Sequence, residues 1–233
     1  MSGTTGSGDR EHAFEELVRG RHSCRSFLPT TVAHDDIERM LELAQTAPSW
    51  CNTQPWSVTM VSGDALTRLS AALLASSVDD TGAADVEPPR EYVGVRQERR
   101  RASGYALYES LGIERDDRAR RIEQANENYR FFGAPHCAII SGDLSLGTYA
   151  ALDCGAYVGT LLLAARSLGI ATIAQAAIAM HSNVVRAELG LRSDESILCG
   201  VSFGFEDTAA PANSFRAPRA PLAESVTWRG AGG

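Results

Sequence analysis

YAALDCGAYVGTLLLAARSLGI, residues 149–170, is the most apolar stretch of the chain. Asp153 and Arg166 interrupt it, so it is too short and too polar to cross a bilayer convincingly. We expect a helix that is apolar on nearly every face, and such a helix must be enclosed on all sides. A subunit partner could enclose it, with Gly155 and Gly159 admitting a second backbone, or it could be the central helix of a monomer. This stretch alone leaves both alternatives open.

Composition narrows the class of protein around this helix. The chain has 233 residues, 44% hydrophobic and 22% charged, which predicts one large globular domain. Its net charge of −7 argues against a nucleic-acid or membrane partner, because both need a basic face. We therefore expect a small-molecule ligand.

The basic residues are all arginine, and the chain contains no lysine. A lysine Schiff base and the lysine-dependent phosphate loop are therefore excluded. Any phosphate must be held by guanidinium groups, hydroxyls or backbone amides. The chain also lacks the Gly-x-Ser-x-Gly and His-Glu-x-x-His motifs, and its histidines are too isolated to predict a metal site.

The cysteines indicate a reducing compartment. There are five, they are scattered, and none forms a Cys-x-x-Cys pair, so neither a disulfide framework nor a zinc site is expected. Residues 1–10, MSGTTGSGDR, read as a flexible tail without an apolar segment, so we expect neither a signal peptide nor an anchor. These features predict a cytoplasmic protein.

Periodicity predicts an alternation of helices and strands. The segment 33–47 has apolar residues at helical spacing and acidic residues in its first turn, and Pro48 ends it. Other helices are expected at 11–20, 64–76, about 95–110 and 115–130, strands at 57–63, 136–141 and 195–205, and a surface insertion at 77–93.

Three polar segments are candidates for chemistry. RHSCRSF, residues 21–27, gathers two guanidinium groups, an imidazole and a hydroxyl; it could bind an anion or be a solvated turn, and alone it favours neither. APSWCNTQPW, residues 47–56, could wrap a planar ring or simply stop a helix with two core tryptophans. In NSFRAPRAPLAE, residues 213–224, Arg216 and Arg219 could complete an anion site or belong to a charged tail.

Taken in order, RHSCRSF, APSWCNTQPW and FGFEDTAAPANSFRAPRAPLAESVTW (203–228) resemble the FMN-dependent nitroreductase family. The PS-x-x-N-x-QPW loop is the most specific of these motifs. The resemblance covers roughly residues 10–228, and the segment 105–135 is similar to the branch that includes nitrobenzoate reductases. It implies an α+β fold, with a mixed sheet flanked by helices, in an intertwined homodimer. Residues 11–233 would form one FMN-binding domain, with 77–130 as an insertion and helical segment.

The resemblance also implies which residues bind FMN at the dimer interface. Arg21, His22, Ser23 and Arg25 would hold the phosphate, ribityl chain and pyrimidine edge, and Arg216 and Arg219 would return to the phosphate. Pro48, Ser49, Trp50 and Asn52 of the other subunit would line the ring. Gln175 and Ala176 would cover its remaining face. Trp50, Cys51 and Phe132 are the candidates for contact with a small aromatic substrate.

The implied activity is ping-pong reduction of an electron-poor aromatic, such as a nitroaromatic, with NADH or NADPH as the donor. The flavin carries the redox chemistry, so no catalytic side chain is expected. The same scaffold could instead serve a dehydrogenase or a reductive dehalogenase, or a flavin-binding module without turnover.

Overall fold

The computed structural model describes residues 7–230, and its centre is a four-stranded sheet in the order β1-β2-β4-β3. The strands are β1 (Trp56–Ser62), β2 (His136–Gly142), β3 (Ala171–Gln175) and β4 (Ser196–Gly204). All three ladders between them are antiparallel, although we expected a mixed sheet. A parallel pairing does occur as an isolated bridge between Ser23 and Thr172, beside the edge strand β3.

The two faces of the sheet carry separate hydrophobic clusters, because side chains alternate along each strand. On β2, Cys137 and Ile139 pack on one face, and Ala138 and Ile140 pack on the other. All four residues are buried. The sheet is therefore the middle of three layers, and its central strands read as continuous apolar runs.

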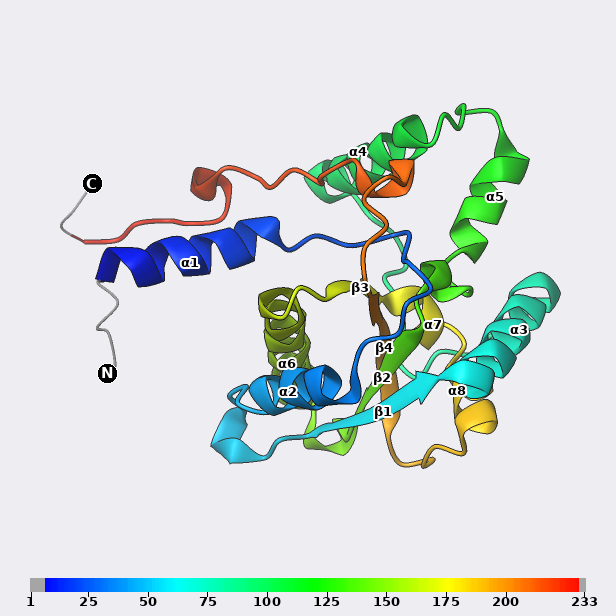
Figure 1. Ribbon diagram of the computed structural model, residues 1–233, viewed down its shortest axis with the longest axis horizontal. Coiled ribbons are helices and arrows are strands. Elements are labelled where there is room, and N and C mark those ends of the chain that lie inside the picture. The colour runs from blue at the N-terminus through cyan, green and yellow to red at the C-terminus, as the bar shows by residue number, and fades with distance from the viewer. Residues whose placement is uncertain (1–6, 231–233) are drawn as a thin grey trace.

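Helices cover both faces, as Figure 1 shows. The helices α2 (His34–Ala44) and α6 (Thr148–Ser167) pack on the face of Ala138 and Ile140. The opposite face is covered by α3 (Gly63–Asp79), the single turn α7 (Ala176–Ala179) and α8 (Ser182–Leu189). The expected α+β fold class is thus confirmed.

The helix α6 is buried on one side only. Tyr157 and Leu161 point into the core against α2 and the sheet, whereas Leu152 is 65% exposed, and Gly155 and Gly159 are also exposed. Its length and composition alone would let α6 cross a membrane. Its contacts with α2 and three strands instead make it a core helix, with a surface stripe that residues 7–230 do not cover.

The remaining helices do not cover a face of the sheet, although one short turn contributes the buried Phe131 and Phe132 to one core cluster. They are α1 (Ser7–Gly20), α4 (Gly94–Ser110), α5 (Arg118–Asn126) and the short turns η1 (Trp50–Asn52), η2 (Phe131–Gly133), η3 (Leu144–Leu146), η4 (Pro211–Asn213) and η5 (Leu222–Glu224). Neither α4 nor α5 contains a fully buried residue. In Figure 1, α1 and the C-terminal segment extend side by side away from the sheet.

Most of the expected elements are present, with two differences. The helix α1 begins at Ser7, so residues 7–10 of the expected tail are helical, and residues 1–6 lie outside the described residues, as do 231–233. The strand β3 was not expected. Its five residues include the polar Thr172 and Gln175, both buried, and pairing with β4 rather than local pattern makes this segment a strand.

Candidate functional site

The heptad RHSCRSF joins α1 to α2 without regular structure of its own. It lies along the sheet edge: the Cys24 N–H donates to Thr172 O at 3.0 Å, and Phe27 forms an antiparallel bridge with Glu206. Cys24 and Phe27 are buried, whereas the residues around them are only partly buried. The apolar members therefore anchor the heptad and leave its cationic members at the surface of the sandwich.

The cationic side chains of the heptad open into a cavity of about 740 Å³ between α1 and the C-terminal segment. We call it the arginine pocket. Its lining is Phe14, Glu15, Val18, Arg19, Arg21, His22, Ser23, Arg25, Phe215, Arg216, Ala217 and Arg219. The structure thus brings together the two basic segments that the sequence separates by almost 190 residues.

The pocket carries uncompensated positive charge. Within residues 7–230, none of Arg21, Arg25, Arg216 and Arg219 forms an ion pair with a carboxylate. Burial and the neighbouring guanidinium of Arg219 lower the pKa of Arg21, and burial lowers the pKa of Arg25. Both effects act against the charged form, so an anion in the pocket would be stabilised strongly.

Local contacts orient these guanidinium groups. The Nη1 of Arg25 donates to Ser23 O at 3.1 Å, and the guanidinium lies 5.2 Å from the centre of the Phe215 ring. Arg216 donates from Nη1 to Asn213 O at 2.7 Å, and Arg219 donates to Ala217 O at 2.9 Å. Each group has further N–H donors available for a ligand, because a guanidinium carries five.

His22 behaves differently from the arginines. Its Nδ1 lies 3.1 Å from Gly20 O, and its Nε2 lies 2.8 Å from a carboxylate oxygen of Glu206. Both ring nitrogens therefore face acceptors within the chain. The imidazole lies at the pocket wall, but its nitrogens are engaged with the protein.

The second predicted segment forms a strained loop at the other end of α2. Cys51, Asn52 and Gln54 all adopt positive φ, at 50°, 58° and 47°. Such conformations are disfavoured for residues other than glycine and cluster at functional sites. Two contacts hold the loop: Trp50 N–H donates to a carboxylate oxygen of Asp153 at 3.0 Å, and Gln54 N–H donates to Ser49 Oγ at 3.0 Å.

This loop, residues 48–54, opens to the surface beside α6. Pro48 and Ser49 line a hollow of about 520 Å³ together with Asp153 and Gly155. Trp50 is 54% exposed and makes an edge contact with Tyr149, and Cys51 and Asn52 are exposed as well. The two predicted halves of the site share no lining residue, and Figure 1 shows them on different sides of the chain.

The other predicted residues lie elsewhere. Ala176 is exposed at the end of β3. The Gln175 side chain is buried, where it donates to Asn128 O at 2.8 Å and accepts from Ser202. Phe132 is 5% exposed in the cluster between the sheet and α3. Neither the Gln175 amide nor the Phe132 ring reaches the two hollows described above.

Three residues at the site were missed by sequence reasoning. Glu206 and Asn213 contact the heptad from segments more than 180 residues away, and no local pattern marks them. Asp153 left a signal: it is a carboxylate inside an apolar helix, and such a group is buried only when it has a partner.

An α+β sandwich whose pocket gathers four arginines without carboxylate partners among residues 7–230 is suited to bind an anionic ligand. Comparison with known proteins gives its family: the nitroreductase family profile matches residues 18–205, and the chain belongs to this family. It is 41% identical to nitroreductase NfnB of Mycolicibacterium smegmatis over 222 residues, covering 94% of each chain. It is 34% identical to 4-nitrobenzoate reductase of Pseudomonas putida, covering 88% of this chain and 91% of that protein.

Solved structures agree. The FMN-dependent nitroreductase NfnB from Mycobacterium smegmatis, in complex with NADPH, superposes with a TM-score of 0.91 at 39% identity, covering 95% of this chain and 100% of that chain. The FMN and NADPH-dependent NfnB from a Sphigopyxis strain gives 0.90 at 36% identity, covering 93% and 98%.

Proposed function

We propose that this protein is an FMN-dependent oxidoreductase that passes a hydride from NADH or NADPH to an electron-poor aromatic such as a nitroaromatic. The observation that carries the proposal is the arginine pocket, where Arg21, Arg25, Arg216 and Arg219 come together from both ends of the chain without carboxylate partners among residues 7–230. A phosphate dianion suits this charge. The similarity to FMN-dependent nitroreductases along nearly the whole chain supports the choice of FMN.

Within one chain, the arginine pocket offers residues for the phosphate end of FMN, but the residues proposed for the ring lie outside this pocket. Arg21, Ser23, Arg25 and Arg219 would hold the phosphate, with Arg216 at the edge of the pocket. Pro48, Ser49, Trp50 and Asn52 would line the ring from a second subunit, because they lie outside the pocket of their own chain. Ala176 would meet the ring through its exposed backbone.

The chain's contribution to catalysis is placement and charge. When bound, FMN supplies the redox chemistry by accepting a hydride from the nicotinamide and passing it on. The guanidinium groups would fix its phosphate end, and their positive charge would favour electron-rich states of a bound ligand. Trp50 and Cys51, both exposed on the strained loop, would shape the acceptor cleft. No side chain is proposed as a general acid, since solvent can supply protons.

We also propose a homodimer. The stripe of α6 formed by Leu152, Gly155 and Gly159 is apolar, exposed and flanked by the hollow beside Pro48 and Ser49. Covering it with a second copy would bury apolar area and bring the loop 48–54 to a neighbouring chain. We place this dimer in the cytoplasm, with neither nucleic acid nor membrane as partner; all five cysteines are free thiols, which suits a reducing compartment.

The purified protein tests this function directly. We expect a yellow protein whose flavin absorbance bleaches under NADH or NADPH and returns on addition of a nitroaromatic. NAD(P)H consumption that the nitroaromatic does not stimulate would contradict turnover while leaving flavin binding intact. A colourless protein that takes up no added FMN would reject the proposal altogether.

A further inference from the structure

The heptad is held by a segment far from it in sequence, residues 205–213, which follows β4. The two segments run beside each other through two backbone hydrogen bonds: Leu28 N–H donates to Phe205 O at 2.8 Å, and Asp207 N–H donates to Ser26 O at 3.1 Å. Together these two bonds make the antiparallel bridge between Phe27 and Glu206. Because the heptad has no helix or ladder of its own, these contacts, together with the bond from Cys24 N–H to Thr172 O, help to determine where its side chains point.

Asn213 is the most constrained residue of this segment. It is 4% exposed, and its Oδ1 accepts from Arg25 N–H at 2.6 Å. Its Nδ2 donates to Ser26 O and to Asp207 O, both at 2.9 Å. The amide therefore uses its acceptor and both donors to join two turns of the chain. Asn213 O also accepts a hydrogen bond from Arg216, so the same residue connects the heptad to the C-terminal segment that lines the arginine pocket.

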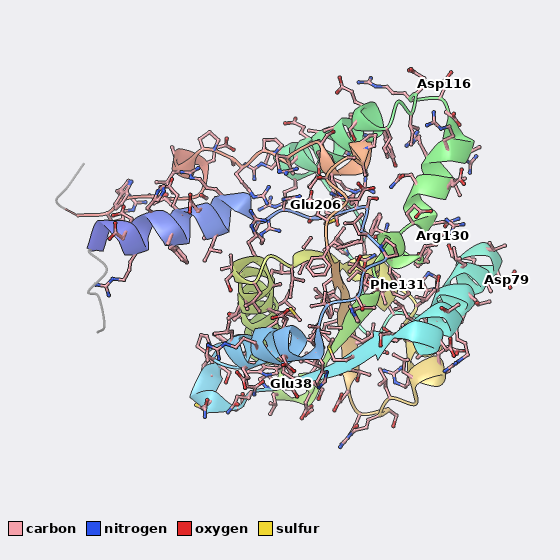
Figure 2. The ribbon with its side chains drawn as sticks, viewed as in Figure 1. Glu38, Asp79, Asp116, Arg130, Phe131 and Glu206 are labelled. Atoms are coloured by element: carbon pink, nitrogen blue, oxygen red, sulfur yellow. The ribbon has the colours of Figure 1, made fainter. Side chains whose placement is uncertain are left out.

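Glu206 makes the second connection. Figure 2 shows it beside the loop that follows α1, where its carboxylate reaches Nε2 of His22. Nδ1 of the same ring lies 3.1 Å from Gly20 O, so each of the two ring nitrogens faces an acceptor of the chain. The His22 side chain is thus fixed between the end of α1 and the exit of β4, and Arg21 and Ser23 flank it.

We propose that Asn213 and Glu206 are positioning residues for phosphate binding, acting through Arg25 and His22 respectively. The inference rests on the proposed FMN site. Glu206 contacts His22, which lies between Arg21 and Ser23 in the sequence, and Asn213 contacts the backbone N–H of Arg25. Bidentate guanidinium contacts need accurate placement, so release of either point would weaken phosphate binding more than flavin binding in general.

The negative charge of Glu206 allows this proposal to be distinguished from a purely electrostatic effect. It is a carboxylate beside an arginine pocket, so long-range electrostatics alone predict that its removal tightens binding of an anion. A positioning role predicts the opposite. The sign of the effect therefore separates the two accounts.

The experiment compares FMN with riboflavin, which has the same ring and no phosphate, using quenching of flavin fluorescence by the full-length protein. We expect Asn213→Ala and Glu206→Ala each to weaken FMN binding about tenfold or more, by loss of about one charge-assisted contact, and to leave riboflavin binding unchanged. Glu206→Gln keeps an acceptor for His22 and should recover most of the preference for FMN.

Asn183→Ala is the matched control, because Asn183 on α8 also bonds backbone groups through its side-chain amide, far from the pocket. It should keep the FMN preference of the wild type.

An unchanged preference in Asn213→Ala, or tighter FMN binding in Glu206→Ala, would overturn the inference. Equal loss of both flavins would show a merely structural role and overturn it too. If Asn213→Ala does not fold, the two Glu206 variants still decide. If the wild type binds neither flavin, it is the proposed function that fails.

Discussion

At the residue scale, the neighbouring guanidinium groups of Arg21 and Arg219 define what the pocket can bind. They are 198 residues apart in sequence, yet the second lowers the pKa of the first. The repulsion between these two like charges costs free energy, and a dianion bound between them would offset this cost. A neutral ligand would not offset the repulsion between the guanidinium groups, so the phosphate end of FMN suits the pocket better than an uncharged group.

Removal of either arginine should therefore weaken FMN binding. Arg21→Ala and Arg219→Ala are each expected to raise the dissociation constant of FMN by about 10- to 100-fold, the range for a hydrogen bond to a charged group. Fluorescence titration of the apoprotein measures this. Arg68→Ala, which removes an exposed guanidinium from α3, is the control. Unchanged affinity in both pocket variants would remove the phosphate assignment.

The cysteines should differ sharply in reactivity. Burial raises the pKa of Cys24 and Cys154 to about 11, and that of Cys137 and Cys199 to about 12. Cys51 alone among the five is exposed, on the strained loop. Because the thiolate is the reactive form, iodoacetamide near neutral pH should label Cys51 and spare the other four in the native apoprotein.

Peptide mass spectrometry after brief labelling checks this pattern. If the loop 48–54 lines the flavin ring in the dimer, added FMN should slow labelling of Cys51. Rapid modification of Cys24 in the folded protein would contradict the burial of the heptad, and labelling of Cys51 that ignores FMN would argue against its loop as the ring site. Denatured protein, in which all five thiols react, provides the reference.

Individual residues also show what the sequence could and could not predict. The sequence shows the arginines of the heptad and of the C-terminal segment as two separate clusters, and only the resemblance joined them into one site. The structure brings both clusters to one pocket. The engagement of His22 by Glu206 could not be predicted, because that contact spans 184 residues. The predicted role of His22 as a direct ligand thus competes with an internal partner that only the fold reveals.

At the element scale, sequence patterns within one element predicted its secondary structure, whereas the pairing of one element with another could not be predicted from the sequence. The short, largely apolar run of β2 and the helical spacing in α2 placed both elements correctly. The strand β3 carries no such pattern, and its neighbours determine its conformation. The position of the loop 48–54 likewise depends on Asp153 of α6, which holds it in a disfavoured conformation and makes loop and helix one unit.

His136 connects β2 to the segment before α2 and should make stability depend on pH. Its Nε2 accepts from Val32 N–H at 3.1 Å, so the bond needs the neutral ring, and burial lowers the pKa of His136 below its ordinary value. The unfolded chain therefore binds a proton that the folded chain does not. Stability from this residue is complete above about pH 6.5 and is lost as pH falls toward the lowered value.

The variant His136→Gln separates this effect from general acid denaturation. Glutamine keeps an acceptor for Val32 but does not titrate, so its melting temperature should fall less than that of the wild type between pH 7.5 and about pH 5.5. His34→Gln makes the same change at an exposed position on α2 and should follow the wild type. Parallel curves for wild type and His136→Gln would show that the Val32 contact does not contribute to acid sensitivity.

At the scale of the whole molecule, one chain contains both halves of the proposed flavin site but does not bring them together. The arginine pocket lies by α1 and the C-terminal segment, and the loop 48–54 lies beside the uncovered stripe of α6. Two copies related by a twofold axis can present each pocket to the partner's loop. The expectation that this apolar helix needs a second subunit thus gains a physical reason, since one of its faces stays exposed.

The glycines of that stripe allow a test that leaves the single chain undisturbed. Apart from the neighbouring backbone of α6 itself, no atom of the described residues lies within 4 Å of a Cβ built at Gly155 or Gly159. A side chain can therefore start outward there in the isolated chain, and leucine improves helix propensity by roughly 1 kcal/mol. At a close helix contact the same side chain would collide with the partner. We expect Gly159→Leu to be monomeric in light scattering, to keep its far-ultraviolet circular dichroism, and to lose FMN. Gly104→Leu on α4, where a Cβ is equally unobstructed, should remain a dimer with bound FMN. A Gly159→Leu protein that stays dimeric and yellow would place the subunit contact elsewhere, and the loop 48–54 could then not reach the partner's pocket by way of α6.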